Sequence, residues 1–297
     1  MNSNNISAEE KQAAKFKQMT EEPVDKLILG LAIPTIASML ITSIYNMADT
    51  YFVGKIGTSA TGAVGVIFPL MTIIQAVGFF FGHGSGNYVS RMLGAKRTKE
   101  CEEMVTTGFV YSLIGGILIT VFGYLFLEPF AVFLGATDTI LPYAVDYLKY
   151  ILIGAPAMVS SFVLNNQLRF QGNAVYGMIG IMIGGLLNMV LDPICIFVLN
   201  MGVAGAAVAT ALSQYICFFV LLYMSNKKSI PIRFKNFRPG AYYFKEIVKG
   251  GLPSLFRQGC SSIAFVMLNH SAGVYGDAAI AAMTVVQRIM QFAASAM

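Results

Sequence analysis

Residues 36–54, IASMLITSIYNMADTYFVG, form an apolar stretch long enough to cross a membrane, yet they contain a carboxylate, Asp49. A second apolar stretch, IGGLLNMVLDPICIFV at 183–198, contains Asp192. A charged side chain in the middle of a membrane helix costs roughly 2.5–3.5 kcal/mol to insert, so a chain that keeps one usually uses it. Asn188 precedes Asp192 by one helical turn, and the two therefore share a helix face. The pattern predicts a buried cation or proton site, which is typical of a transporter.

The composition is that of a membrane protein. The chain is 56% hydrophobic and 12% charged, whereas an average soluble domain is about 25% charged. Apolar stretches of about 20 residues, enough to cross roughly 30 Å of hydrocarbon as helices, recur along the whole chain. We therefore predict an all-α polytopic membrane protein. Its spans are expected near residues 27–53, 60–89, 104–127, 140–163, 174–199, 203–224 and 247–269, with an eighth beginning near 278.

Lys and Arg are distributed unevenly between the two sides of this arrangement. If the tail at 1–26 is cytoplasmic, nearly all Lys and Arg outside the spans lie in loops on that side, and the opposite side has Lys55 alone. This asymmetry predicts a multi-pass protein of the prokaryotic cytoplasmic (inner) membrane with a cytoplasmic N-terminus. The net charge of +5 is then an orientation signal. We expect no nucleic-acid partner, because the basic residues are not gathered on one folded soluble face.

The first apolar segment has a second copy further along the chain. Pro34 aligns with Pro253 and Gly54 with Gly273, without a gap. Six spans separate the copies, so both cross in the same direction, as in transporters built from parallel repeats. Two full repeats would make a protein of roughly 440–460 residues, so we expect this chain to be a fragment or a truncated product. The predicted divisions are a tail (1–26), an amino-terminal six-helix lobe (27–224), a cytoplasmic linker (225–246) and the start of a carboxyl-terminal lobe (247–297).

Five motifs carry a resemblance to a known family. In chain order they are PTIASMLITSIYNMADTYFVGKIG at 34–57, GHGSGNYVSRMLGAKR at 82–97, LRFQGN at 168–173, LLNMVLDPICIF at 186–197 and GVAGAAVATALSQ at 202–214. Their order and spacing resemble those of the multidrug and toxic compound extrusion (MATE) transporters, over essentially the whole chain. The most similar branch is the prokaryotic one with an aspartate in the first span. The resemblance implies two six-helix lobes forming a V and the exchange of organic cations for Na⁺ or H⁺.

The resemblance also implies roles for individual residues. The positions matching that branch's cation site are Asp49, Asn188, Asp192 and Thr210; those matching the drug cavity are Tyr45 and Asn165; the position at which the first helix bends is Pro34. The four cation-site residues would be metal ligands only if Na⁺ is the coupling ion. No other cofactor is implied.

The residues support this cation site independently. The first and fifth spans run outward, so their acids lie in the outer half of the membrane, and Thr210 lies at the same level on the inward-running sixth span. Carboxylate, amide and hydroxyl oxygens suit Na⁺, while a proton needs only a carboxylate whose affinity burial or a like charge has raised. The sequence does not choose between the two ions.

Several structural interpretations compete with the functional ones. Asp49 could snorkel or cap a helix, and Asp192 could help to satisfy the backbone freed by Pro193. Asp146 and Lys149 fit an ion pair, and His83 fits a helix contact. We further expect Tyr143, Tyr147 and Tyr150 to form an interfacial aromatic belt, and His270 to begin an outer loop.

Three functions remain open. The first is a cation-coupled antiporter that exports drugs or toxic organic cations, with the lipid bilayer as its other partner and a monomeric state when complete. The second is a lipid-linked oligosaccharide flippase, which would need several cationic residues in its cavity; the sequence offers two buried acids and almost no buried Arg in this lobe. The third is an inactive remnant of a transporter. We expect no enzyme, since the sequence has no nucleophile–base pair, phosphate-binding loop or metal-ligand cluster.

Overall fold

The computed structural model of the chain describes residues 23–227, 230, 232, 234 and 237–295. These residues form helices and short connections and no strand, which confirms the predicted all-α fold. The helices are α2 (Val24–Gly54), α3 (Thr58–Gly94), α4 (Thr98–Leu125), α5 (Leu127–Phe133), α6 (Leu141–Phe170), α7 (Ala174–Pro193), the π-helical turn η1 (Ile194–Val198), α8 (Gly202–Ser225), α9 (Ala241–Gly273) and α10 (Asp277–Ser295).

Six of these helices are long and apolar enough to cross a membrane: α2, α3, α4, α6, α7 together with η1, and α8. They correspond to the first six predicted spans, and their ends lie within a few residues of the predicted ones except for longer inner ends on α3, α4 and α6. The segments predicted as the seventh span and the start of the eighth are the helices α9 and α10, but neither is among the six. The short helix α5 was not predicted.

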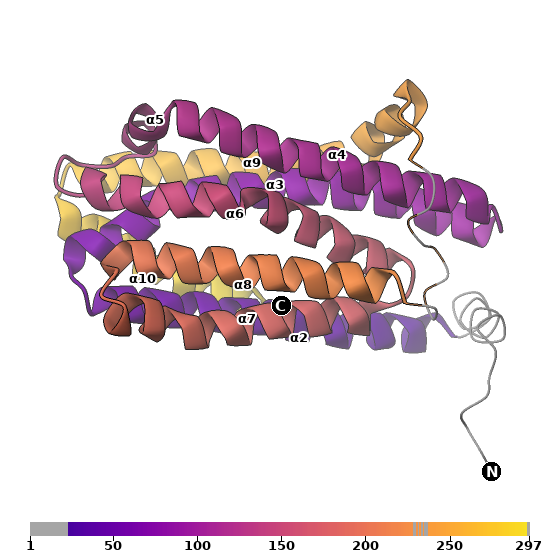
Figure 1. The fold of residues 1–297 in the computed structure, drawn as a ribbon, viewed down its shortest axis with the longest axis horizontal. Helices are drawn as coiled ribbons and strands as arrows, with labels where there is room; N and C mark the ends of the chain where they lie inside the picture. The colour runs from indigo at the N-terminus through magenta and orange to yellow at the C-terminus, as the bar shows by residue number, and fades with distance from the viewer. Residues whose placement is uncertain (1–22, 228–229, 231, 233, 235–236, 296–297) are drawn as a thin grey trace, which may run out of the picture.

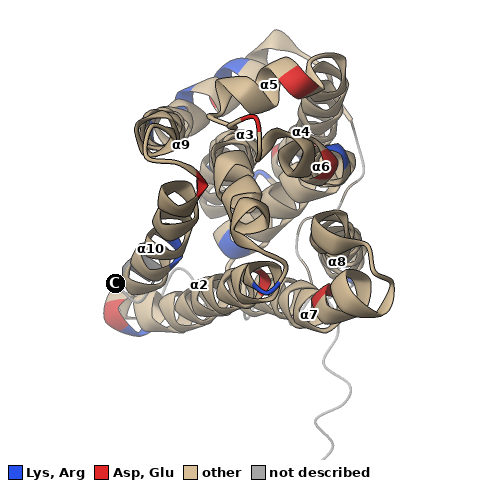
Figure 2. Cartoon of the chain, turned by 90° about the vertical axis from the view of Figure 1, so that its left-hand side faces the viewer, with Lys and Arg blue, Asp and Glu red and all other residues tan. Residues whose placement is uncertain are grey.

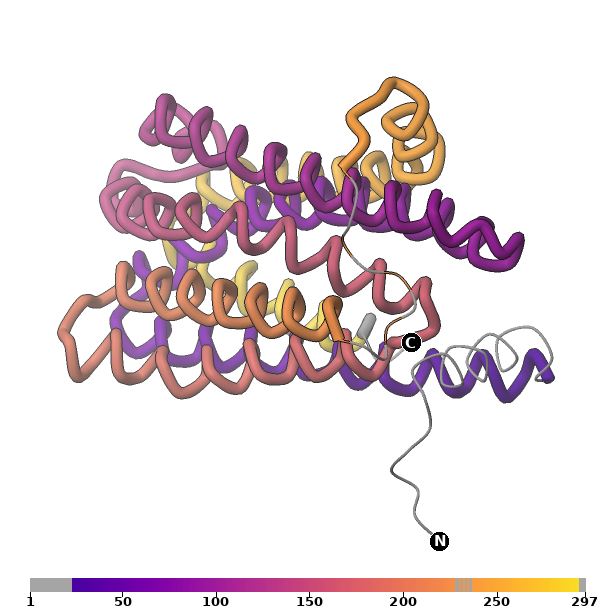
Figure 3. The backbone as a smooth tube through the Cα atoms, turned by 45° about the vertical axis from the view of Figure 1, so that its right-hand side comes forward, coloured from indigo at the N-terminus to yellow at the C-terminus, as the bar shows by residue number. Residues whose placement is uncertain are grey.

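The helices lie in two groups along the long axis of the molecule. In Figure 1 the helices α3, α4, α6 and α9 lie above α2, α7, α8 and α10. The tube in Figure 3 shows the same separation of α2, α7 and α8 from α3, α4 and α6. The helix α3 is the centre of the assembly, since it packs against α9, α6, α4 and α10. The largest hydrophobic core lies among α3, α6, α8 and the outer turns.

Glycines allow α9 of the second repeat to lie directly against α3. The Cα atom of Gly84 is 3.1 Å from the position that a Cβ on Gly250 would occupy. A Cβ on Gly84 would in turn lie 2.9 Å from the carbonyl carbon of Ile247. Small residues at such crossings allow membrane helices to approach at backbone distance. The contact continues outward, where Ser262 donates to the carbonyl of Pro69 at 2.9 Å.

The two ends of the bundle differ in charge. The connections at 95–97 and 171–173 and residues 226–227 lie at one end, together with the start of α2. That end carries Lys96, Arg97 and Lys227, whereas the connection at 55–57 at the opposite end, which Figure 2 views, carries Lys55. The arrangement is the one that the charge asymmetry predicts. The direction of insertion stays a prediction.

Polar contacts fasten the beginning of α9 to the inner end of α4. Glu103 of α4 accepts hydrogen bonds from Tyr243 at 2.5 Å and from Arg238 at 3.3 Å. Arg91 of α3 pairs with Glu246 at 3.2 Å. Because α9 begins at Ala241, the last part of the predicted linker 225–246 is helical. The division into lobes and linker stays a prediction.

Two expectations about outer residues were wrong, and one was confirmed. Tyr147 is only 1% exposed and belongs to the core, so it is not part of an interfacial belt, whereas Tyr143 is 44% exposed. His270 lies within α9 rather than in a loop, and its Nε2 is 3.0 Å from the carbonyl oxygen of Phe133. Lys149 pairs with Asp146 at 3.1 Å, as predicted.

Candidate functional site

Three of the four predicted cation-site residues form one hydrogen-bonded group. Asn188 and Asp192 lie one turn apart on α7, and Thr210 lies on the neighbouring α8. The amide nitrogen of Asn188 donates to Oδ1 of Asp192 at 3.1 Å and to the hydroxyl of Thr210 at 3.3 Å. All three side chains are at most 4% exposed. The structure therefore places a carboxylate, an amide and a hydroxyl together inside the bundle.

The backbone changes its winding immediately after Asp192. The α-helix ends at Pro193 and continues as the π-helical turn η1. A π turn inside a helix frees or re-aims side chains and is frequent at functional sites. The turn is packed closely against α8, because a Cβ on Gly205 would lie 2.6 Å from the carbonyl oxygen of Cys195. Gly205 thus allows α8 to approach the segment that carries Asp192.

Asp49 approaches this group from α2. Its side chain is 4% exposed, and its carboxylate interacts electrostatically with that of Asp192. α2 packs on α7 near this level, where a Cβ on Gly185 would lie 2.9 Å from Cδ1 of Tyr45. The fourth predicted residue therefore lies in the same electrostatic environment, although no hydrogen bond joins it to the other three.

The four residues offer more acceptors than donors. Oδ1 of Asp49, Oδ1 of Asn188 and Oδ2 of Asp192 are buried without a hydrogen-bond partner. A buried acceptor without a donor is costly, and each such atom needs an explanation. Protons or a hard monovalent cation would satisfy these oxygens, since Na⁺, like Mg²⁺ and Ca²⁺, prefers carboxylate, amide and hydroxyl ligands. Within the described part of the chain, there is no group of three or more His, Cys, Asp or Glu side chains that could hold a metal ion.

The two residues predicted to line a drug cavity lie in different places. Tyr45 is within electrostatic reach of both Asp49 and Asp192. Asn165 is a buried residue of α6. It lies against α7, where a Cβ on Gly177 would be 2.7 Å from its Nδ2. The structure therefore brings Tyr45 to the acidic group and leaves Asn165 on α6, against a different part of α7.

The predicted hinge, Pro34, lies inside a helix that is continuous on both sides of it. Proline lacks the N–H that would bond to the preceding turn, which makes its position a weak point of a helix. The hydroxyl of Ser38 donates to the carbonyl oxygen of Pro34 at 2.7 Å. A bending role for Pro34 stays a prediction.

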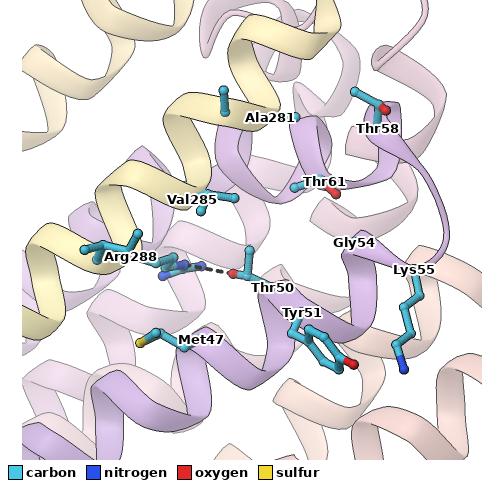
Figure 4. Close-up of a pocket in the computed structure, with 12 residues that line it drawn as sticks. Met47, Thr50, Tyr51, Gly54, Lys55, Thr58, Thr61, Ala281, Val285 and Arg288 are labelled. Carbon is cyan, nitrogen blue, oxygen red and sulfur yellow. Dashed lines mark hydrogen bonds between the residues drawn. The ribbon is translucent and has the colours of Figure 1, made fainter.

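A buried cation near Asp49 was not predicted from the sequence. Arg288 of α10 is only 4% exposed, and its Nε donates to the hydroxyl of Thr50 at 3.2 Å. Figure 4 shows its side chain reaching from α10 to α2. The expectation of almost no buried Arg concerned residues 27–224, whereas Arg288 belongs to α10. The gapless alignment of the two repeats makes α10 the counterpart of α3. Nothing in the sequence around Arg288 links this residue to α2.

A cavity of about 630 Å³ opens between α2, the start of α3 and α10. Its walls are mostly apolar, with Met47, Val285 and Ile289 among them, and Arg288 and Lys55 are its charged lining residues. The cavity is adjacent to the acidic group, because Thr50 lines it and Asp49 is the preceding residue of α2.

Comparison with known proteins agrees with this geometry. The sequence profile of the MatE family matches residues 34–194, which is more than half of the chain and includes Asp49, Asn188 and Asp192. The chain belongs to the MatE family. The multidrug export protein MepA of Staphylococcus haemolyticus is 30% identical over 275 residues, which cover 92% of this chain and 61% of that protein. A MepA of Staphylococcus aureus is 31% identical over 279 residues, with the same shares. These MatE relatives are transporters rather than enzymes, as expected.

Solved structures of the family superimpose on the chain. The MATE multidrug transporter DinF-BH is 30% identical, with a TM-score of 0.87, over 93% of this chain and 63% of that one. A multidrug resistance MATE transporter in the inward-facing conformation gives a TM-score of 0.77 at 30% identity, over 91% of this chain and 64% of that one. The chain thus spans less than two thirds of the length of these relatives. Its six apolar helices and its bacterial relatives make it a multi-pass bacterial membrane protein.

Proposed function

We propose that this MatE chain is part of a cation-coupled antiporter that exports drugs or toxic organic cations across the cytoplasmic membrane. The observation that carries the proposal is the buried group of Asp49, Asn188 and Asp192, with three oxygen acceptors that have no donor. Buried acceptors of this kind need a proton, a cation or a hydrogen-bond donor as partner. The relatives named as multidrug exporters support the substrate class.

In the proposed cycle, a coupling cation and a cationic drug compete for the same negative charge. Na⁺ or H⁺ entering from outside would neutralise the carboxylates of Asp49 and Asp192. Neutralisation would remove the attraction for a drug cation in the neighbouring cavity, and the drug would leave outward. Pro34 would let α2 bend when the charge of Asp49 is neutralised. The bend would narrow the cavity. Drug release is thereby linked to ion entry by electrostatics.

The remaining parts of the proposal follow from the same arrangement. Tyr45 and Asn165 would contact the drug on α2 and α6. The N-terminus would be cytoplasmic, as the Lys and Arg distribution favours. Residues 27–224 would form one lobe, and 247–297 would begin the second; the complete protein would act as a monomer.

The test is transport by the complete gene product in liposomes. The transport rate of the lipophilic monocation tetraphenylphosphonium is measured in two separate assays. One applies only a Na⁺ gradient, and the other applies only a pH gradient. Asp49→Asn should abolish gradient-driven transport while leaving membrane insertion intact, because the acceptor charge is lost. Asp138→Asn is the matched control, since Asp138 is an exposed outer carboxylate. Undiminished transport by Asp49→Asn would overturn the proposal, and the gradient that drives the wild type identifies the ion.

The flippase alternative predicts the opposite response. A carrier for a polyprenyl pyrophosphate needs cationic side chains to bind its cargo, so removal of an acid should not reduce its activity. The predominance of acceptors around Asp49 and Asp192 favours a cationic cargo.

A further inference from the structure

The helix α6 bends near its middle, where it contains a proline. Pro156 lies halfway along α6, and Figures 1 and 3 show the two halves of this helix running in different directions. Proline has no N–H, so the carbonyl four residues earlier, that of Leu152, loses its helical donor. The proline ring also crowds this turn, which kinks the helix. Leu152 is buried, and its freed carbonyl therefore needs another partner.

Hydroxyls from two neighbouring helices bind the carbonyls of this turn. The helix α6 lies between α4 and α8 (Figures 1 and 2). From α4, Thr120 donates to the carbonyl of Leu152 at 2.6 Å, which is shorter than its 3.1 Å contact with the Gly116 carbonyl of its own helix. From α8, the hydroxyl of Tyr215 donates to the next carbonyl, that of Ile153, at 2.9 Å. The kink is therefore held from both sides.

Both neighbouring helices also approach the kink at backbone distance. A Cβ on Gly116 of α4 would lie 2.5 Å from the Cα atom of Pro156. On the other side, a Cβ on Gly154 of α6 would lie 3.3 Å from the Cα atom of Ala211 on α8. Contacts this close leave little room for either helix to shift along α6. The position of α8 is thus tied to the bend of α6.

The contact between α6 and α8 lies beside the candidate cation site. Ala211 directly follows Thr210, whose hydroxyl accepts a hydrogen bond from Asn188 at 3.3 Å. That distance is at the long end of the range for such bonds, so a small displacement of α8 would break it. Thr210 can contribute its hydroxyl to the site only while α8 keeps its distance from α7.

We propose that the kink of α6 at Pro156, held by Thr120 and Tyr215, positions Thr210 to coordinate the coupling ion. Pro156, Thr120 and Tyr215 are positioning residues, because they act on the site only through α8. When either hydroxyl is lost, a smaller fraction of the molecules holds the binding geometry, and the apparent affinity for the ion falls by that fraction. This inference deepens the proposed function and rests on it.

The experiment measures tetraphenylphosphonium transport by the complete gene product in liposomes over a range of coupling-ion concentrations. Tyr215→Phe removes one hydroxyl and should raise the half-saturating ion concentration about two- to tenfold, with the maximal rate unchanged. Thr120→Val should have the same effect, whereas Thr120→Ser keeps a hydroxyl and should restore the wild-type value. Tyr124→Phe is the matched control and should change neither quantity, since its hydroxyl binds a different α6 carbonyl, that of Lys149, at 2.7 Å.

A Thr210→Ala background distinguishes positioning from general support of the fold. If Tyr215 acts through Thr210, Tyr215→Phe should have no further effect on ion affinity once the Thr210 hydroxyl is removed. An equal effect of Tyr215→Phe in both backgrounds would overturn the inference, and so would a wild-type ion affinity of Tyr215→Phe itself.

The outcomes also separate this inference from the proposed function. If Asp49→Asn leaves ion-driven transport intact, the proposed function fails. If Asp49→Asn abolishes transport while Tyr215→Phe keeps the wild-type ion affinity, only the positioning role is wrong. Should Tyr215→Phe fail to fold, Thr120→Val and Thr120→Ser decide, because the inference requires the valine variant to bind the ion more weakly than the serine variant. Equal ion affinities of these two variants would overturn it.

Discussion

Nδ2 of Asn188 lies 3.1 Å from Oδ1 of Asp192, so the amide donates to one oxygen of the carboxylate while Oδ2 of the same group has no donor. The same amide nitrogen is 3.3 Å from the hydroxyl of Thr210 on α8. Asn188 therefore fixes the orientation of the Asp192 carboxylate and leaves its second oxygen available to a cation.

Replacement of Asn188 by Ala should weaken cation binding without changing the charge of the group. A hydrogen bond to a charged group contributes about 1.5–3 kcal/mol, which corresponds to roughly a 10–100-fold loss of affinity. The measurement is cation binding to the purified complete protein by calorimetry. Asn226→Ala is the control, because this exposed amide just after α8 donates to the Leu222 carbonyl at 3.1 Å and to no other group in the described part of the chain. Equal affinities of wild type and Asn188→Ala would show that the amide does not orient the site.

Replacement of Gly84 by Ala should separate α3 from α9. The new Cβ would lie 2.9 Å from both the carbonyl carbon and the Cα atom of Ile247, and backbone atoms cannot move aside as a flexible side chain can. Overpacking of this kind typically costs about 1–3 kcal/mol. The measurement is the thermal stability of the protein by size-exclusion chromatography after heating.

Gly94→Ala offers a matched control for that substitution. Gly94 belongs to the same helix, and a Cβ there would have no neighbour within 4 Å. We expect Gly94→Ala to leave the melting temperature unchanged or slightly raised, because alanine is the better helix former. If Gly84→Ala and Gly94→Ala have the same melting temperature, the close approach of α3 and α9 does not contribute to stability.

The outer turn before α10 should make stability depend on pH. Hydroxyl hydrogen bonds from Thr139, then Thr137 and Ser59, hold the pKa of Asp277 below its usual value against the opposing effect of burial. The three hydroxyls lie 2.6, 2.7 and 2.9 Å from the carboxylate. Because the folded pKa is below the unfolded value of about 3.9, this stabilisation is present above that value and is lost as the pH falls through the folded pKa.

Asp277→Asn should therefore lower the melting temperature at pH 7 by a few degrees, about 2–4 °C, and the difference from the wild type should shrink below about pH 4. The check is a pair of melting curves at pH 7 and at about pH 3, with the exposed Asp138→Asn as control. A difference that stays constant across this range would mean that the charge of Asp277 does not hold the turn.

The long helices could be predicted because each is encoded locally. A run of apolar residues is sufficient to identify a span, and the helix α7 begins at Ala174, where the fifth span was predicted to begin. The helix α5 could not be predicted in this way, since seven residues are too few to show a period. The placement of Asp192 with Thr210 followed from their depth in neighbouring spans.

Contacts between distant segments explain what the sequence did not reveal. Tyr147 was expected, with Tyr143 and Tyr150, in an interfacial aromatic belt, but the packing of α6 inside the bundle buries it. Arg288 and Thr50 are 238 positions apart, and only the three-dimensional arrangement of the two repeats brings them together. The candidate site is therefore partly local, in α7 and α8, and partly a product of tertiary packing.

The central place of α3 has a consequence for the time course of synthesis. Its carbonyl at Gly65 accepts a hydrogen bond from Asn269, which is 204 positions later in the chain. A ribosome that adds about 5–20 residues per second needs roughly 10–40 s to make that partner. Throughout this delay the glycine-rich face of α3 faces lipid or temporary neighbours. The helix that packs against α4, α6, α9 and α10 is thus among the first to enter the membrane, and its packing is completed only after α9 has been made.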